Sequence, residues 1–222
     1  MADWTTISSL ATAGGTLVLA VATFSSVRSA NKAARVAERA FQVGLRPVLM
    51  PSRLEDPPEK MRWLEGRWAR VPGGRGYIEE ADGTIFLAMS LRNVGSGIAV
   101  LQGWLTEAGR PSLEDGRPDP DRFRRQARDL YIPPGGTGFW QGGLRDHDVG
   151  EAAPQLAGED ENYQAVHDAI TSGEMLTITL LYSDHEGGQR AMSQFLLTPT
   201  SGTPEWMNSV IRHWNLDRAD PR

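Results

Sequence analysis

The pattern of hydrophobic and polar residues changes abruptly near the N-terminus. Residues 4–27 read WTTISSLATAGGTLVLAVATFSSV and carry no charge, and basic residues begin directly afterwards at Arg28. A helix of about 24 residues is about 36 Å long, enough to cross a bilayer core of about 30 Å. The uncharged run therefore predicts a transmembrane helix.

The helical pattern continues beyond the uncharged run. Residues 27–43 (VRSANKAARVAERAFQV) are rich in good helix formers and contain neither proline nor glycine. Gly44 can cap the end of this helix, and Pro47 prevents its continuation. We therefore expect residues 1–44 to form a transmembrane helix that continues into a basic juxtamembrane helix.

Two other interpretations of the N-terminal segment stay open. It could be a buried helix of a soluble protein, or a signal peptide, since Ala20-Val21-Ala22 resembles a small-residue cleavage site. A signal peptide carries positive charge before its apolar part, whereas the charges here follow it, so an uncleaved anchor fits better. Lys and Arg beside a membrane helix stay in the cytoplasm. The charges therefore predict an external N-terminus and a cytoplasmic C-terminal part.

One side of the predicted helix carries mostly small side chains, at alternating spacings of four and three residues. This small-residue seam consists of Ser9, Ala13, Thr16, Ala20, Thr23, Val27, Ala30, Ala34 and Ala37. Small residues let membrane helices approach closely, and the spacing is that of a coiled coil. The seam predicts association with a second copy of the chain or with another membrane protein. Alternatively, a segment so rich in Ser, Thr and Ala contains such a seam by chance.

A second side of the helix carries its positive charge. This basic stripe consists of Arg28, Lys32, Arg35 and Arg39, again spaced by four and three residues. Next to a membrane, such a stripe can contact anionic lipid headgroups. It can equally be a solvated face that follows the preference of basic residues for the cytoplasmic side. In either case the lipid bilayer is the expected partner of the N-terminal segment.

The rest of the chain contains several strand signals and one clear hairpin. Apolar or alternating stretches predict strands over 46–54, 84–92, 98–107, 137–144, 175–183 and 189–198. The last two are joined by the turn sequence DHEGG at 184–188. In the first of them, apolar residues at alternate positions are separated by Thr177 and Thr179. This alternation predicts a hairpin with one buried face.

Helical signals after residue 44 are short and peripheral. They cover residues 119–129, residues 158–172 and a C-terminal segment, 203–216, in which Trp206, Val210 and Trp214 share one helical side. Residues 55–76 predict a long loop or a loose hairpin. We therefore expect a mainly β fold: an antiparallel, Ig-like β-sandwich over 45–200 with short peripheral helices, followed by a C-terminal helix and tail over 201–222.

Composition narrows the class of partner. The net charge is −5 although the juxtamembrane segment is basic, so the remainder is more acidic still. Nucleic-acid binding needs a basic face, so we do not expect nucleic acid to be a partner of this acidic part of the chain. The chain has no cysteine, which agrees weakly with a cytoplasmic domain.

Several short motifs carry a family resemblance. After the membrane helix and the Ala-rich basic helix come LRPVL at 45–49, LRNVGSGIAV at 91–100, YIPPGG at 131–136 and LYSDHEGG at 181–188. Together they resemble a broad group of uncharacterised bacterial single-pass membrane proteins with a small Ig-like β-domain. The resemblance implies a location in the bacterial plasma membrane and implies no activity, because each of these motifs is a turn signature.

Catalytic signatures do not emerge from the sequence. The triplets Asp146-His147-Asp148 and Asp184-His185-Glu186 fall where turns are expected, and no Ser stands in a G-x-S-x-G setting. The glycine clusters lack the Lys-Ser/Thr of a phosphate-binding loop. We therefore expect no catalytic residue, no cofactor and no metal.

The tryptophans offer one further candidate surface. Trp63, Trp68 and Trp140 fall in loop or edge contexts, where they either form a partner surface or cover one end of the core. The sequence as a whole predicts a membrane-anchored, non-enzymatic interaction or scaffold protein. The alternative is an exported β-sandwich that binds a ligand and has a cleaved or inward-facing N-terminus.

Overall fold

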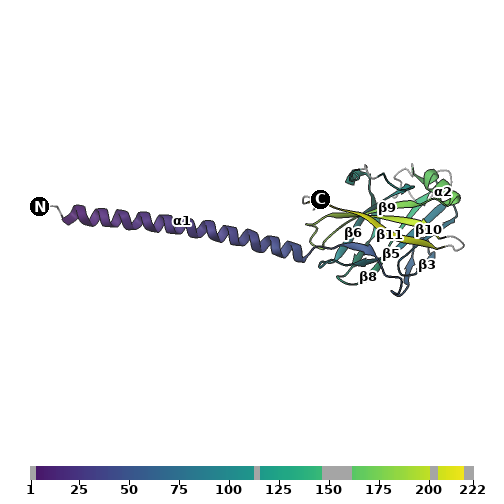
Figure 1. The fold of residues 1–222 in the computed structure, drawn as a ribbon, viewed down its shortest axis with the longest axis horizontal. Coiled ribbons are helices and arrows are strands. Elements are labelled where there is room, and N and C mark those ends of the chain that lie inside the picture. The colour runs from purple at the N-terminus through teal and green to yellow at the C-terminus, as the bar shows by residue number, and fades with distance from the viewer. Residues whose placement is uncertain (1–3, 113–115, 147–161, 201–204, 218–222) are drawn as a thin grey trace. The chain divides into compact units, whose positions relative to one another are not determined.

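The computed structural model describes the chain except for residues 1–3, 113–115, 147–161, 201–204 and 218–222. The chain divides into two units, Met1–Gly44 and Leu45–Arg222. The first unit consists of one helix, α1 (Trp4–Gly44), which includes the uncharged run and the basic segment without a break (Figure 1). The single continuous helix expected from the sequence is confirmed.

The second unit is mainly antiparallel β-structure. Its elements are β1 (Leu49–Pro51), β2 (Glu59–Arg62), β3 (Trp68–Val71), β4 (Arg75–Ala81), β5 (Thr84–Asn93), β6 (Ala99–Ala108), the 3₁₀ helix η1 (Pro120–Arg122), β7 (Arg124–Ile132), β8 (Thr137–Arg145), α2 (Tyr163–Ser172), β9 (Leu176–Ser183), β10 (Ala191–Pro199) and β11 (Trp206–Asn215).

Nine of these strands form one curled sheet. Its order is β1-β5-β4-β11-β10-β9-β6-β7, and β8 pairs with the other edge of β5. The side chain of Gln126 on β7 donates a hydrogen bond to the carbonyl oxygen of Gln141 on β8, which brings the two ends of the sheet together. A mainly β, antiparallel domain is confirmed, whereas the two separate sheets of an Ig-like sandwich are not.

The core lies inside the curl of the sheet. On β9, Leu176, Ile178 and Leu180 are fully buried in this core. Thr177 and Thr179 between them are buried as well, so the expectation that only one face of this strand is buried is wrong. Trp104 and Trp140 meet edge to face in this core, with ring centroids 5.3 Å apart. The core cluster runs from Leu49 to Trp206 and so includes no residue of α1. The second unit therefore has a hydrophobic core of its own.

The segment expected as a loop or loose hairpin is a hairpin, formed by β2 and β3. Its inner face carries Met61, Trp63, Ala69 and Val71, which pack on Phe86 in a second, smaller core. The indole Nε1 of Trp63 donates to the carbonyl oxygen of Gly142 at 3.0 Å. The hairpin is therefore fixed on the outer surface of the sheet.

The expected C-terminal helix is wrong, because residues 206–215 form strand β11, paired with β10 and β4. Trp206 and Val210 do share a face, but a spacing of four residues fits a strand, with a period of two, as well as a helix. The register shift between Gln194 and Phe195 then places Trp214 opposite Met192. An even spacing of apolar residues alone cannot separate the two structures.

The other two expected helices differ in outcome. Residues 119–129 do not form an α-helix: the turn η1 occupies only Pro120–Arg122, and β7 follows and pairs with β6. Within 158–172 the helix α2 is confirmed, with Tyr163, Val166 and Ala169 buried against the sheet. The first part of that segment lies outside the described residues.

Candidate functional site

The small-residue seam and the basic stripe both lie on α1. All nine seam residues are exposed, as are Arg28, Lys32 and Arg35 of the stripe. Arg39 belongs to α1, but its side chain lies outside the described residues. The helix thus keeps these residues in the register that the sequence predicts and leaves their surface available to a partner.

The apolar side chains of α1 are exposed as well. Leu17, Val18, Val21 and Phe24 are among them. Within α1, the stretch Ser8–Glu38 contains an 18-residue window of mean hydropathy 1.6, none of it buried. Leaving one such side chain in water instead of burying it costs roughly 1.5–3 kcal/mol. The helix is long and apolar enough to span a membrane.

The hydroxyl groups of α1 donate hydrogen bonds within the helix. Thr12 Oγ1 donates to the carbonyl oxygen of Ser8 at 2.9 Å, and Thr16 Oγ1 donates to that of Thr12 at 2.8 Å. Ser25 Oγ donates in the same way to the carbonyl oxygen of Ala22. A hydroxyl bonded to its own helix costs less to transfer into hydrocarbon than an unpaired one. The polar residues that dilute this segment are therefore compatible with a lipid environment.

The chain enters the second unit at what we call the helix-exit end of the sheet, where Asn93 gathers several segments. The Asn93 side chain is fully buried. Its Oδ1 accepts hydrogen bonds from the backbone N–H groups of Val48 and Gly95, at 3.1 and 3.0 Å. Its Nδ2 donates to the carbonyl oxygens of Gly97 and Ile132, at 2.6 and 2.9 Å. One side chain therefore links the residues that follow α1 to two turns.

The turn that follows Asn93 also forms hydrogen bonds with the residues that come directly after α1. The carbonyl oxygen of Arg46 accepts hydrogen bonds from the N–H groups of Ser96 and Gly97, at 2.9 and 3.3 Å. A Cβ atom at Gly95 or Gly97 would collide with the carbonyl oxygen of Arg46 or Leu45. The two glycines of this motif are thus required for close backbone approach.

A buried polar network lies beneath this clamp. The hydroxyl of Tyr182 accepts from the N–H of Leu49 at 3.2 Å and lies 2.9 Å from the hydroxyl of Ser193, which donates to the Leu49 carbonyl oxygen. The Nδ1 atom of His213 is 3.2 Å from the Ser193 hydroxyl. Burial raises the pKa of Tyr182, so its phenol stays neutral. The network joins β1 to β9, β10 and β11.

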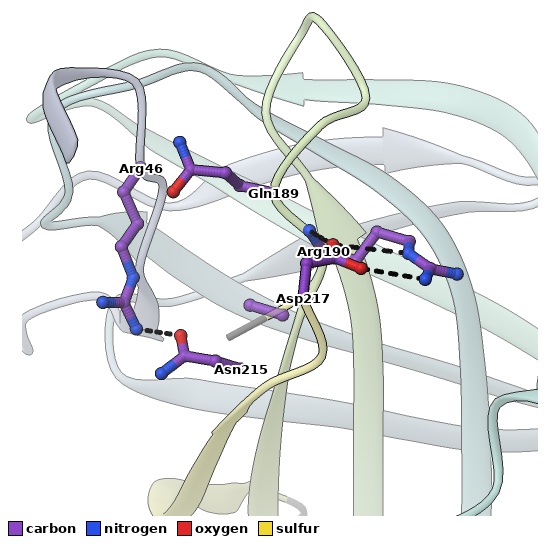
Figure 2. Close-up of a pocket in the computed structure, with 6 residues that line it drawn as sticks. Arg46, Gln189, Arg190, Asn215 and Asp217 are labelled. Carbon is purple, nitrogen blue, oxygen red and sulfur yellow. Dashed lines mark hydrogen bonds and ion pairs between the residues drawn. The ribbon is translucent and has the colours of Figure 1, made fainter. Parts of the chain in front are cut away.

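Arg46 contacts this network through His213, and its side chain points toward Asn215 (Figure 2). Its guanidinium donates to Asn215 Oδ1 and lies 3.3 Å from His213 Nε2. Because guanidinium has no acceptor, His213 Nε2 must accept, and its proton therefore lies on Nδ1. Beside it, Arg190 forms an ion pair with Asp217 at 2.9 Å.

The hollow between these residues is too small for a substrate. Its volume is about 10 Å³, enough for about one water molecule. Sites for small organic ligands have volumes of about 300–1,000 Å³. Ser193 is fully buried, so its hydroxyl beside the His213 imidazole lies within the domain and not on this hollow.

The histidines expected in turns have simple surroundings where they are described. His185 Nε2 lies 3.3 Å from Glu186 Oε1 of the neighbouring residue. His167, which was expected in a helix and lies on α2, has its Nδ1 2.9 Å from Glu80 Oε2. His147 lies outside the described residues. Across the described parts of the chain, no group of three His, Cys, Asp or Glu side chains could hold a metal ion.

The four motifs of the sequence resemblance meet at the helix-exit end. Besides the contacts above, the N–H of Gly135 donates to the Asn93 carbonyl oxygen at 2.8 Å, and the N–H of Asn93 donates to that of Gly136 at 3.0 Å. From the sequence, each motif is predicted only as a turn, and nothing in the pattern identifies Ser193, His213 or Asn215 as contact residues. The last two were hidden by the wrong assignment of β11 as a helix.

No protein-family model and no curated protein matches this sequence. The resemblance to bacterial single-pass proteins with an Ig-like domain therefore stays a prediction.

Proposed function

We propose that this protein is a single-pass membrane protein in which α1 is the anchor and the second unit is a non-enzymatic interaction module. The carrying observation is the exposed apolar window of α1, together with a second unit whose core needs no part of that helix. A helix with a long uncharged, mainly apolar stretch that is not buried in protein is stabilised by lipid. By its flanking charge, the second unit lies in the cytoplasm.

The helix-exit end supports a role in fixing the module to its anchor. The residues directly after Gly44 are held by Asn93, by the turn that follows it and by the Tyr182 network. These contacts connect the start of the second unit to strands from both halves of the sheet. A pull or rotation applied at Leu45 is thereby transmitted to the whole sheet.

Protease treatment of spheroplasts that express the full chain tests this function. We expect the protein in the membrane fraction after alkaline carbonate washing, and the second unit protected until the membrane is lysed. Digestion of the second unit in intact spheroplasts would contradict the orientation. An intact mass lacking about the first 20 residues would support the exported alternative, since a signal peptide spans about 15–30 residues.

The small-residue seam supports self-association or docking on another membrane protein. Replacing Ala13 and Ala20 by Leu places bulk between approaching helices and should reduce dimer cross-linking several-fold, in line with packing-driven association. The chain has no cysteine, so one introduced cysteine at Thr23 reports the dimer by disulfide formation. Ala22→Leu, about 200° around the helix from Ala20, is the matched control. Unchanged cross-linking in the double variant would eliminate the seam as an interface.

A further inference from the structure

The β2–β3 hairpin has an outer face whose composition differs from that of its inner face. The outer hairpin face consists of Lys60, Arg62, Trp68 and Arg70, all exposed. At the alternate positions Met61, Ala69 and Val71 are buried and Glu59 is partly buried. Trp68 is 65% exposed, and Leu64 in the turn between the strands is 70% exposed. The Arg62 guanidinium lies over the Trp68 ring, 5.7 Å from its centroid. An exposed indole and leucine thus stand among three cations.

This arrangement is unfavourable for the isolated hairpin. Lys60 lies directly opposite Arg70 in the strand register, and like charges in such a pair are destabilising. Glu65, in the turn of the hairpin, pairs with Arg145, and Glu79 pairs with Arg67 of the same turn. Among the residues that the structure describes, neither Lys60 nor Arg70 has an ion-pair partner. A partner that supplies negative charge would remove this repulsion.

We propose that the outer hairpin face binds the anionic headgroups of a bilayer surface, with Trp68 and Leu64 at the level of the headgroups. Trp prefers the membrane interface, and each Lys or Arg near an anionic surface contributes about 1 kcal/mol. The inference rests on the proposed membrane anchor, which keeps a bilayer within reach. Anionic lipid is favoured over an acidic protein because Lys is depleted at protein interfaces, whereas basic residues with Trp and Leu are typical of interfacial lipid binding.

The position of the hairpin makes this proposal specific. Its turn lies beside Arg145 at one end of β8, whereas Thr137, at the other end, is opposite Arg92 next to the Asn93 clamp. The turn of the hairpin therefore lies at the end of β8 away from the Asn93 clamp. Docking should then respond to lipid charge while α1 stays inserted.

The full chain in nanodiscs tests the proposal with a single fluorescent label. Because the chain has no cysteine, Leu64→Cys can carry an environment-sensitive dye. We expect a blue shift in discs of phosphatidylcholine that contain about 30% phosphatidylglycerol, because this lipid makes the disc surface anionic. We expect no blue shift in discs of pure phosphatidylcholine. A label at exposed Gln164 on α2 should not respond. Incorporation into discs tests the anchor separately, so the two failures are distinguishable.

Charge reversal separates binding from folding. Lys60→Glu changes the face by two charges and should lower the ratio of docked to undocked protein about thirtyfold. Its thermal midpoint should be equal to or above that of the parent chain, because a cross-strand repulsion becomes an attraction. Arg125→Glu, an equal change on exposed β7, should leave docking unaltered. Equal blue shifts in both lipids, or an unaffected Lys60→Glu variant, would overturn the proposal. A response to poly-L-glutamate and none to anionic discs would instead identify an acidic polypeptide as the partner.

Discussion

Replacing Leu17 and Val21 together by arginine should release the protein from the membrane. Both side chains lie in the uncharged part of α1 and are exposed, at 67% and 63%. One arginine at the centre of a membrane helix costs about 2.5–3.5 kcal/mol, so two cost about 5–7 kcal/mol. We expect the variant to move from the pellet to the supernatant after alkaline carbonate extraction. No smaller change to the chain should affect localisation as strongly.

The control for this variant also introduces two arginines, but in the part of α1 that follows the uncharged run. Ala34→Arg and Ala37→Arg add equal charge to the segment after Arg28, which already carries basic residues. Outside the hydrocarbon this charge has little cost, so the doubly substituted control should stay in the pellet. If the Leu17→Arg, Val21→Arg protein also stays there, the segment is not embedded in lipid and the proposed anchor is wrong.

Local patterns were sufficient to locate several strands and the long helix. The alternation over 175–183 predicted β9 and its hairpin with β10, but it did not predict that Thr177 and Thr179 are buried as well. The helix was predictable because a long uncharged run and good helix formers need no tertiary information. The same logic identified β5, β6 and β8 to within a few residues.

Two helices were wrongly predicted, over residues 203–216 and 119–129. In both segments the local sequence is compatible with a helix and with a strand. The even spacing of Trp206, Val210 and Trp214 satisfies a strand and a helix alike, and pairing with β10 decided for the strand. Pro120 does begin a helical turn, but β6 offers a backbone partner from Arg124 onward. Tertiary pairing, which no local window contains, outweighed propensity in both cases.

The helix-exit end illustrates a limit of a different kind. The turn motif after Asn93 was recognised as a turn because of its glycines, but its role depends on Val48 and Ile132, which are 45 and 39 residues away. A single sequence does not show which distant backbone groups form hydrogen bonds with an asparagine side chain. The sequence suggests that the glycines are there for the conformational freedom of a turn. In the structure they are required because the backbone of residues 45–48 packs directly against them.

Replacing Asn93 by alanine should be the most damaging single change within the second unit. It removes both acceptor contacts and both donor contacts at a fully buried position, and it leaves the Gly97 and Ile132 carbonyl oxygens without this partner. Each buried group left unsatisfied costs about 1–3 kcal/mol. We expect a loss of about 3–5 kcal/mol in the free energy of unfolding, against a total of about 5–15 kcal/mol for a typical domain.

Denaturant unfolding of the full chain in mild detergent, followed by tryptophan fluorescence, measures this loss. Val94→Ala is the matched control, since its side chain lies in the same turn but is 54% exposed, and its effect should stay within about 0.5 kcal/mol. Asn93→Asp should not restore stability, because a carboxylate cannot donate to the two carbonyl oxygens and buries a charge. If Asn93→Ala and Val94→Ala unfold at the same denaturant concentration, the contacts at Asn93 do not hold the start of the sheet. The start of the second unit would then be held by the turn after Asn93 and by the Tyr182 network.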